Sequence, residues 1–458
     1  MRKLWLSLFA IVVLALAFGP AFLSAEKPAD EELQVISPHW DGIRYEFGRA
    51  FEEYYRQKYQ KNIRMVWLDV GGGTGEIKKY LNARFKPESG TGVDILFGGG
   101  MDILPEMASG GLFEPYTLSP EQRELIPEEV NGQELRDKDG RYFAACLSSF
   151  GFVYNKLVLE RAKLSTPQKW ADLTTPEYKG WVSCGNPTQS GSLHMAFELI
   201  LQGEGWEKGY ATLTRMASNV RAFNEGGTSV PRDVSLGQVA AGPVIDFYAS
   251  APIRRQGASH LQLVIPKGMS VATPDCIAIL RTPPNRRAAF AFMDFVLSEA
   301  GQRLWYQARG EPGGPVEYDL ERLPVMPKVY EMGLKTFTVT NPFTNKPDFK
   351  YDGRKASARW VALNDLWRAT MIDIHDLLWD TREAVVKAGR DHDLGMAMGQ
   401  PPLSEKALLD LAAKRLSADQ RNALRNRWSA WAKEWYGKIQ SAAASGGSVP
   451  AFQPAPAE

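Results

Sequence analysis

The sequence predicts an α/β fold, built from a largely parallel sheet with helices on its faces. Segments typical of strands alternate with segments typical of helices from Leu33 onward, and the connections between them are short. Glycine and hydroxyl residues cluster after several of the predicted strands. Open sheets of this kind bind ligands beyond the carboxyl ends of their strands. We therefore expect a ligand site at these ends.

The first part of the chain gives five elements in order. Leu33–Ile36 is a short apolar run typical of a strand, and apolar residues at helical spacing follow from Ile43 to Tyr54. Ile63–Val70 is rich in residues that favour strands, Glu76–Phe85 is typical of a helix, and Val93–Phe97 predicts the next strand. This alternation is the basis for the predicted fold class.

A second α/β unit begins near Ser148. It contains a strand that leads into a polar loop and an apolar helix, then a helical segment at Trp206–Met216 and a strand at Pro243–Tyr248. Val271–Leu280 predicts a further strand, and Arg286–Gln302 predicts a helix.

The character of the chain changes near Leu320. A turn-rich stretch is followed by a long helical pattern at Ala356–Ala388, and Ser404 and Ser417 are good helix N-caps. Trp428, Trp431 and Trp435 fall on one helix face, which is typical of a buried packing stripe. We expect a helical extension over residues 331–440. Residues 441–458 are small, polar and proline-rich, which predicts a disordered tail.

The first 25 residues have the pattern of a secretory signal. Two basic residues precede an almost wholly apolar run, which ends in small residues suited to cleavage. An uncleaved membrane anchor is the alternative, because the run is long. Gly19 and Pro20 interrupt the run and no basic cluster follows it, so we favour cleavage and export into a periplasm.

The charge balance excludes a nucleic-acid or anionic-membrane partner. Cleavage removes Arg2 and Lys3 but no acidic residue, so the formal charge of +1 becomes −1. The chain has three cysteines, Cys146, Cys184 and Cys276, all in apolar surroundings. This count is low for a disulfide-built exported protein, and buried, unreactive thiols are the favoured interpretation.

The glycine-rich sequence Gly71–Glu76 follows a predicted strand. Glu76 and Ile77 stand where a nucleotide triphosphatase loop needs Lys and Ser or Thr, and the glycine spacing also fails the dinucleotide fingerprint. What remains is a cluster of backbone N–H groups at a helix start, which suits an oxyanion. A purely structural turn is the equal alternative. Gly98–Gly100 closes the next strand in a similar way.

The stretch Val182–Ser192 is the most informative part of the chain. It runs from a strand through hydroxyl, amide and glycine residues into an apolar helix. The first N–H groups of a helix have no partner within the helix, and the helix dipole makes them attractive to an anion. Serine is also an ordinary N-cap residue, so one such loop is weak evidence. Here the arrangement recurs along the chain.

Two more strand ends carry polar side chains. Ser37-Pro38-His39-Trp40 closes the first strand, where His39 suits either a metal or an anion and Trp40 suits stacking on a ligand. A loop histidine that only caps the next helix is the equal alternative for His39. Asp246 and Tyr248 close a later strand, where Asp246 suits a ligand amine and Tyr248 an anion or Fe(III). Ordinary packing of Tyr248 is the alternative. The other histidines are scattered without metal-ligand spacing, and no nucleophile elbow or paired carboxylates stand out.

As an ordered set, these motifs resemble one family. The strand–Ser37-Pro38-His39 and strand–Gly-Gly-Thr-Gly segments are followed by Val93–Gly100, Leu147–Lys156, Trp170–Gly180 and Asn186–Ser192. The set resembles the periplasmic solute-binding proteins of ABC importers, in the branch that holds ferric-ion, thiamine and organophosphate binders. The match spans roughly residues 33–329.

The resemblance implies two lobes that close on a ligand like a hinged clamp. Lobe 1 would comprise residues 33–145 and 274–330, and lobe 2 residues 146–273. The strands crossing between them would include residues 144–154 and 272–280. Cys146 and Cys276 would then lie on neighbouring hinge strands, where a disulfide is a minor alternative to free thiols.

The implied function is binding without catalysis. A small anionic solute, such as an organophosphate, phosphonate or carboxylate, would be captured between the lobes and delivered to a membrane permease by a monomer without a cofactor. An Fe(III) receptor using His39 and Tyr248 is an alternative, although ferric relatives carry two adjacent tyrosines where this chain has Phe247-Tyr248. An exported hydrolase and a ligand-sensing adaptor are the others. The expected ligand-binding residues are Ser37, His39, Gly73, Thr74, Gly100, Ser149, Ser190, Gly191, Ser192, Asp246 and Tyr248.

Overall fold

The computed structural model describes residues 29–71, 73–100, 103–257, 259–337, 341–344 and 347–456. The predicted signal sequence therefore lies outside the described residues. Within them, no helix has the length and apolar character needed to cross a membrane.

Lobe 1 is built on a six-stranded sheet with the order β2-β1-β3-β13-β4, and β7 pairs with β13 beside it. Its side chains alternate between two cores, as strand geometry requires: Leu33 and Val35 enter one, and Ile36 enters the other. Its strands are β1 (Glu31–Ile36), β2 (Ile63–Leu68), β3 (Ile95–Gly100), β4 (Phe113–Glu114), β7 (Phe143–Ser148) and β13 (Thr273–Leu280).

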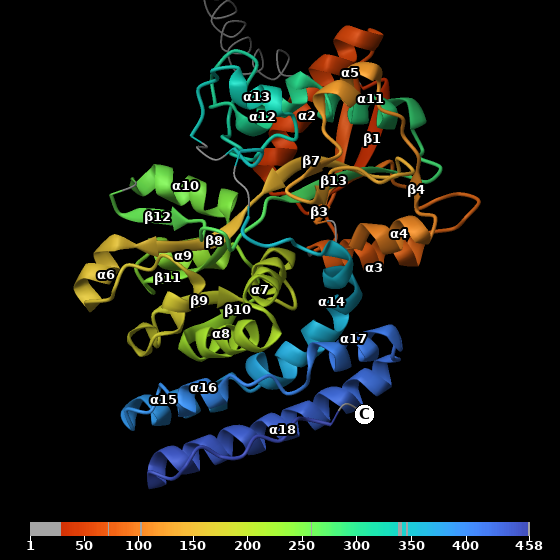
Figure 1. The fold of residues 1–458 in the computed structure, drawn as a ribbon. Coiled ribbons are helices and arrows are strands. Elements are labelled where there is room, and N and C mark those ends of the chain that lie inside the picture. The colour runs from red at the N-terminus through yellow and green to blue at the C-terminus, as the bar shows by residue number, and fades with distance from the viewer. Residues whose placement is uncertain are drawn as a thin grey trace, which may run out of the picture.

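Helices cover both faces of this sheet (Figure 1). One face carries α2 (Asp41–Tyr59), α11 (Arg286–Val296) and α12 (Glu299–Tyr306). The other carries α3 (Thr74–Arg84) and α4 (Leu104–Ser109). Three shorter elements complete the lobe: helix α5 (Pro120–Leu125) and the hairpin of β5 (Glu129–Val130) and β6 (Gln133–Glu134).

Lobe 2 is built on a five-stranded sheet with the order β10-β9-β11-β8-β12. Its strands are β8 (Phe150–Asn155), β9 (Val182–Gly185), β10 (Val220–Asn224), β11 (Ala241–Ile245) and β12 (Leu261–Val264). The α-helices are α6 (Lys156–Ala162), α7 (Gly191–Glu204), α8 (Trp206–Asn219), α9 (Ser229–Ser235) and α10 (Asp246–Gln256), with short 3-10 turns at Trp170–Thr174 and Pro176–Tyr178.

The expectation of largely parallel sheets is wrong in part. The pairs β1–β2, β1–β3, β9–β10 and β9–β11 are parallel. However, β13 is antiparallel to β3, β4 and β7, and β8 is antiparallel to β11 and β12. The reason is that β8 and β13 are the strands next to the hinge, and each enters its sheet from the other lobe instead of through a βαβ connection.

Two short connections cross between the lobes. The chain passes from β7 in the first sheet to β8 in the second through Ser149 alone, and it returns from β12 to β13. Both crossings lie side by side, because Thr273 is in register with Ser148. The two-lobe architecture with two crossing strands that the sequence predicts is therefore present.

The C-terminal helices, α14 to α18, pack under lobe 2 and share its hydrophobic core (Figure 1). They follow the short helix α13 (Pro327–Glu331). Their bounds are α14 (Gly353–Trp367), a π-helical turn at Arg368–Ile372, α15 (His375–Lys387), α16 (Leu394–Met398), α17 (Glu405–Ala413) and α18 (Ala418–Ser445).

Buried polar contacts join these helices to lobe 2. The Arg359 guanidinium donates to the Glu198 carboxylate at 2.7 Å, and both side chains are fully buried. The His194 ring lies on the Trp360 ring with 3.4 Å between centroids. Trp428 and Trp435 are buried as the helical spacing predicts. The C-terminal helices are therefore packed as an integral part of lobe 2.

The prediction of a disordered tail is wrong for residues 441–456. Helix α18 continues to Ser445, and the chain then turns back along it. Trp428 Nε1 donates to the Pro456 carbonyl and Trp431 Nε1 to the Gln453 carbonyl, while Phe452 packs on Trp435. The tryptophan face supplies apolar surface and N–H donors, and these outweigh the local preference for disorder. All three cysteines are buried, and none of them forms a disulfide within the described residues.

We predict that Glu31→Gln lowers stability in a pH-dependent way. Burial acts to raise the pKa of the Glu31 carboxyl, but hydrogen bonds from Lys61, Tyr55 and Asn285 outweigh it and lower the pKa to about 2. Because the pKa is depressed in the fold, the stabilisation is present above the ordinary value of 4.5 and is lost as the pH falls towards 2. After allowance for solvent screening, the loss at neutral pH is about 1 kcal/mol.

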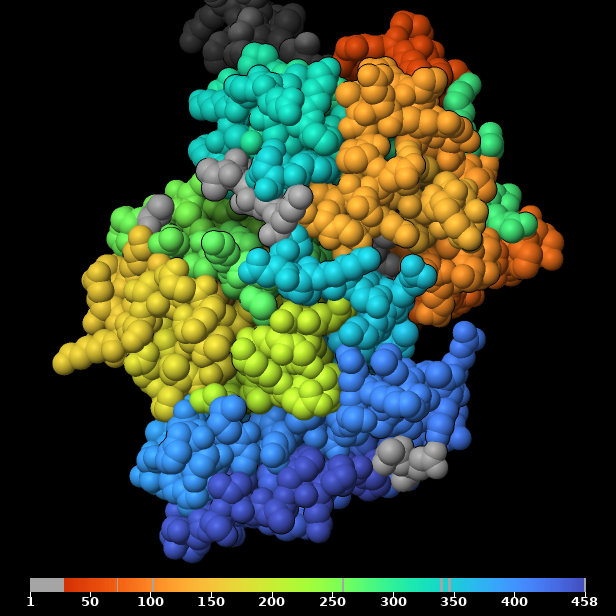
Figure 2. Space-filling model, viewed as in Figure 1, coloured from red at the N-terminus to blue at the C-terminus, as the bar shows by residue number. Residues whose placement is uncertain are grey.

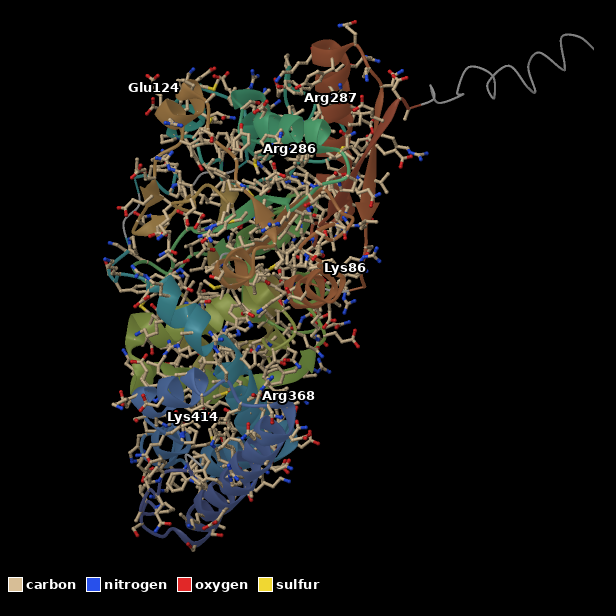
Figure 3. The ribbon with its side chains drawn as sticks, turned by 90° about the vertical axis from the view of Figure 1, so that its right-hand side faces the viewer. Lys86, Glu124, Arg286, Arg287, Arg368 and Lys414 are labelled. Carbon is tan, nitrogen blue, oxygen red and sulfur yellow. The ribbon has the colours of Figure 1, made fainter. Side chains whose placement is uncertain are left out.

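Urea unfolding at pH 7 and pH 3 measures this difference. The two chains should differ at pH 7 and converge towards pH 3, and an equal difference at both would contradict the charge-based explanation. Arg287 pairs with the same carboxylate, and it lies in lobe 1, far from the C-terminal helices where Arg368 is labelled (Figure 3). Neither Glu31 nor Arg287 lines the cavity between the lobes, so Glu31→Gln should leave ligand binding unchanged.

Candidate ligand-binding cleft

A cavity of about 3210 Å³ separates the two lobes. Lobe 1 lines it with the start of α3 and the end of β3, and lobe 2 lines it with the loop before α7 and the loop after β10. Residues of α14, among them Trp360 and Asn364, line it as well. In the space-filling view the cyan residues near 350–360 lie between lobe 1 and the green helix α7 of lobe 2 (Figure 2). The C-terminal helices thus contribute to the cleft.

The lobe 1 wall presents a helix start. Helix α3 begins at Thr74, and its N-cap is Gly73, which has no side chain to occupy the first N–H groups. Gly99 lies beside it with φ +106°, and a Cβ at Gly99 would come within 3.2 Å of the Thr74 methyl. Only glycine adopts this backbone conformation without strain. The glycines here let the end of β3 approach the start of α3.

The lobe 2 wall presents a second helix start. Strand β9 ends at Gly185, and Asn186 shapes the turn by accepting from the N–H and the hydroxyl of Thr188. Ser190 is the N-cap of α7, and its hydroxyl lies 3.1 Å from that of Ser192. Gly227 closes over both, since a Cβ there would fall 2.9 Å from Ser192 Oγ. The Ser190 hydroxyl also accepts from the Leu193 N–H, so two hydroxyls gather at the start of α7.

These two helix starts lie close together on the cavity wall, one from each lobe. A Cβ placed on Gly191 would lie 3.9 Å from Thr74 Oγ1, and one on Gly73 would lie 3.9 Å from the Gln189 carbonyl oxygen. Each helix start carries a partial positive charge and unpaired N–H donors. An anion between them would meet both dipoles and the hydroxyls of Thr74, Ser190 and Ser192.

A cluster of charged groups stands at the hinge end of the cleft. The Asp275 carboxylate accepts from Arg322 Nη2 and from the Gly99 N–H, and it lies 3.2 Å from His39 Nε2. Burial acts to raise the pKa of Asp275, but the charge of Arg322 and the contact with His39 hold it well below its usual value. Burial lowers the pKa of the His39 imidazole, although the Asp275 carboxylate opposes this.

The cavity brings together eight of the eleven residues predicted from the sequence. Those on its wall are His39, Gly73, Thr74, Gly100, Ser190, Gly191, Ser192 and Tyr248. Gly100 belongs to strand β3, although the predicted strand ended at Phe97. The strand continues to Gly100 because Asp275 of β13 pairs with Gly100. Trp40, which follows His39, lines the cavity too.

Ser37, Ser149 and Asp246 do not line the cavity, so these three expectations need correction. Ser37 Oγ accepts from the His39 N–H. The Asp246 carboxylate accepts from the N–H groups of Ser149 and Phe247, and burial raises its pKa to about 6. Both carboxylate oxygens of Asp246 therefore already accept backbone hydrogen bonds within the protein. Asp246 joins the hinge crossing to the start of α10 and is not placed to receive a ligand amine.

The sequence reasoning missed Ser148, Gly227, Asp275 and Arg322. All four line the cavity. Ser148, Asp275 and Arg322 lie in no glycine or hydroxyl cluster after a parallel strand. Gly227 does, since Gly226-Gly227-Thr228-Ser229 follows the parallel strand β10, but the sequence reasoning did not single out this cluster. Ser148 and Asp275 are on hinge strands, and Arg322 is brought to them by an isolated bridge between Leu147 and Leu323. Such pairing between distant segments leaves no periodic signal. Among the described residues, no group of three or more His, Cys, Asp or Glu is arranged to hold a metal ion.

Comparisons with known proteins agree with this geometry. Residues 92–328 match the family model of the bacterial extracellular solute-binding proteins, and the chain belongs to this family. A curated relative, the phosphoglycerate transport regulatory protein PgtC of Salmonella typhimurium, is 28% identical over 256 residues, or 54% of this chain and 59% of that protein. The chain therefore matches only about three fifths of the length of this relative.

Solved structures show the same fold. The periplasmic binding protein AfuA from Actinobacillus pleuropneumoniae, with fructose-6-phosphate bound, has a TM-score of 0.61 and 21% identity, covering 76% of this chain and all of that one. Iron-bound HitA from Pseudomonas aeruginosa has a TM-score of 0.55 and 18% identity, covering 74% of this chain and 98% of that one. The two-lobe fold and the family resemblance inferred from the sequence are thus confirmed.

Proposed function

We propose that this chain is the periplasmic receptor of an ABC importer for a small organic phosphate. Its monomeric form would capture the solute between the lobes and deliver it to a permease in the membrane, without catalysing a reaction. The observation that carries the proposal is the closeness of two helix starts, with Thr74 on one and Ser190 and Ser192 on the other. Phosphate groups bind well at such helix starts.

The chemistry of the cleft favours a phosphate over Fe(III). Ferric coordination by tyrosine needs the phenolate, but burial raises the pKa of Tyr248. The other candidate ligand, His39, directs Nε2 to Asp275. The neighbouring residue Phe247 has no oxygen. By contrast, hydroxyls and backbone N–H groups are donors, and a phosphate offers oxygens that accept from them.

The printed names of similar proteins point to the same class of solute. One relative is named for phosphoglycerate, and one solved structure contains fructose-6-phosphate. Both molecules carry a phosphate on a short carbon chain. We therefore take phosphate esters of small hydroxy compounds as the first candidates.

A ligand-sensing adaptor is the second candidate, because the Salmonella relative is named as a regulatory protein. Uptake of a labelled phosphate ester separates the two functions in cells that lack this chain and express the permease from a constitutive promoter. Lost uptake supports the receptor, and retained uptake supports the adaptor.

Calorimetric titration of the exported chain, from residue 26, tests the proposed solute class. We expect heat of binding with at least one of 3-phosphoglycerate, glycerol 3-phosphate and fructose 6-phosphate, and none with fructose. Thermal unfolding is the second readout, since ligand at a hundredfold excess over Kd adds about 2.7 kcal/mol of stability. Binding of Fe(III) citrate without binding of any phosphate ester would contradict the proposal.

A further inference from the structure

The hinge end of the cleft contains buried donors that have no partner. Arg322 is fully buried and lines the cavity, yet its Nε and Nη1 atoms make no hydrogen bond. Ser148 is 2% exposed, lines the same cavity, and its hydroxyl also has no partner. Leaving such groups unsatisfied costs free energy, so buried polar groups are normally paired. A ligand at this end would pair them.

Ser148 and Arg322 are neighbours because of the backbone. Leu147 and Leu323 exchange two hydrogen bonds, of 2.6 and 3.2 Å, in an antiparallel bridge. In an antiparallel bridge between these two residues, Ser148 after Leu147 lies opposite Arg322 before Leu323. The two donors are therefore held together at the point where the chain crosses between the lobes.

Burial acts to lower the pKa of Arg322, and the charges of Asp275 and Asp246 both act to raise it. Among the described residues, only Asp275 accepts a hydrogen bond from the guanidinium, so only one of these carboxylates is bound directly to it. One of its nitrogens, Nη2, donates to Asp275, but that carboxylate also accepts from Gly99 and contacts His39. The Phe247 ring centre lies 4.1 Å from the guanidinium carbon and that of Trp305 lies 5.7 Å away. These aromatic walls exclude water, and a charge interaction is stronger in such surroundings.

A chain of contacts connects this corner to the two helix starts. From Arg322 it passes through Asp275 and Gly99 to Thr74 on the lobe 1 side. On the lobe 2 side it passes through Phe247 and Tyr248 to the Gly227 loop over Ser190 and Ser192. The two donor groups thus belong to one ring of residues around a single space.

We propose that Arg322 and Ser148 bind a carboxylate of the solute, so that the receptor selects phosphorylated carboxylic acids. This inference rests on the proposed function, in which the helix starts hold the phosphate. A carboxylate suits this corner because it is planar and matches a guanidinium. It also carries one negative charge, so it is repelled less by the nearby Asp275 than a phosphate dianion would be.

The test compares 3-phosphoglycerate with glycerol 3-phosphate, which has a hydroxymethyl group in place of the carboxylate. We expect the wild-type chain to bind 3-phosphoglycerate at least about tenfold more tightly, the effect of a hydrogen bond to a charged group. Arg322→Met should abolish this preference, and Ser148→Ala should reduce it. Ser148→Ala keeps the Asp275–Arg322 pair, so it serves even if Arg322→Met fails to fold.

Thr214→Val is the matched control, because Thr214 is fully buried and its hydroxyl has no partner, like that of Ser148, but it does not line the cavity. It should leave the preference between the two solutes unchanged. Equal binding of both solutes by the wild-type chain would overturn the carboxylate site while leaving the phosphate receptor intact. Binding of neither solute, nor of any other phosphate ester, would overturn the proposed function itself.

Discussion

A chain carrying Thr74→Val and Ser192→Ala together is expected to bind a phosphate ester about 100-fold more weakly than the wild type, because two hydrogen bonds to a charged group are lost. Thr74 stands at the start of α3 and Ser192 at the start of α7, on opposite sides of the cleft. Neither hydroxyl caps its helix, so the unfolding free energy should stay within about 0.5 kcal/mol of the wild type. Calorimetric Kd values and urea unfolding measure the two effects.

Thr214→Val is the control for this pair. Thr214 is fully buried in α8, its hydroxyl has no partner, and it does not line the cavity. Its replacement should leave Kd unchanged. Retained affinity in the folded double variant would show that the phosphate lies elsewhere in the cleft.

Arg359→Met is expected to cost about 3–5 kcal/mol of stability, because it leaves the Glu198 carboxylate buried without its partner. Arg359 donates to Glu198 from Nε and Nη2, and to Glu405 from Nη1. Burial already raises the pKa of Glu198, although Arg359 opposes this. Urea unfolding at pH 7 measures the loss.

Lys406→Met is the matched control in the same part of the chain. It breaks the Lys406–Asp410 pair, whose side chains are 84% and 61% exposed. Exposed pairs contribute about 1 kcal/mol at most. If Arg359→Met were as mild as Lys406→Met, the C-terminal helices would not be the integral part of lobe 2 that the shared core indicates.

The part of the fold that follows from local patterning was predictable. The order β1, α2, β2, α3 is read from apolar spacing because each of these elements buries one regular face. The antiparallel pairing of β8 and β13 was not, since it depends on which distant segments meet at the hinge. The tail over residues 441–456 was also missed. Its order comes from the tryptophans of α18, not from its own composition.

In the cleft too, residues with a local sequence pattern could be predicted, and residues placed by contacts between distant segments could not. Gly73, Thr74, Ser190 and Ser192, which line the cavity, were predicted because helix starts after strands have a recognisable sequence. Asp246 was assigned to the ligand because an acid at a strand end has the same sequence whether it faces a cavity or the backbone of its neighbour. Arg322 had no signal at all, because only the bridge between Leu147 and Leu323 brings it to the hinge.

The hinge pairing makes the segment after residue 320 part of the cleft. Removing everything after residue 320 would delete Arg322 and uncover the apolar surface of α7 and α8 that the C-terminal helices bury. Such a truncated chain would test folding more than function. Single substitutions in the full chain are the better probe.

The central claim is that a phosphate is held between the starts of α3 and α7. A crystal structure of the chain with a bound phosphate ester tests it most directly, by locating the phosphorus atom. We predict phosphate oxygens within hydrogen-bond distance of Thr74 on one lobe and of residues 190–192 on the other. A phosphate bound to one lobe alone, or held away from both helix starts, would contradict the account.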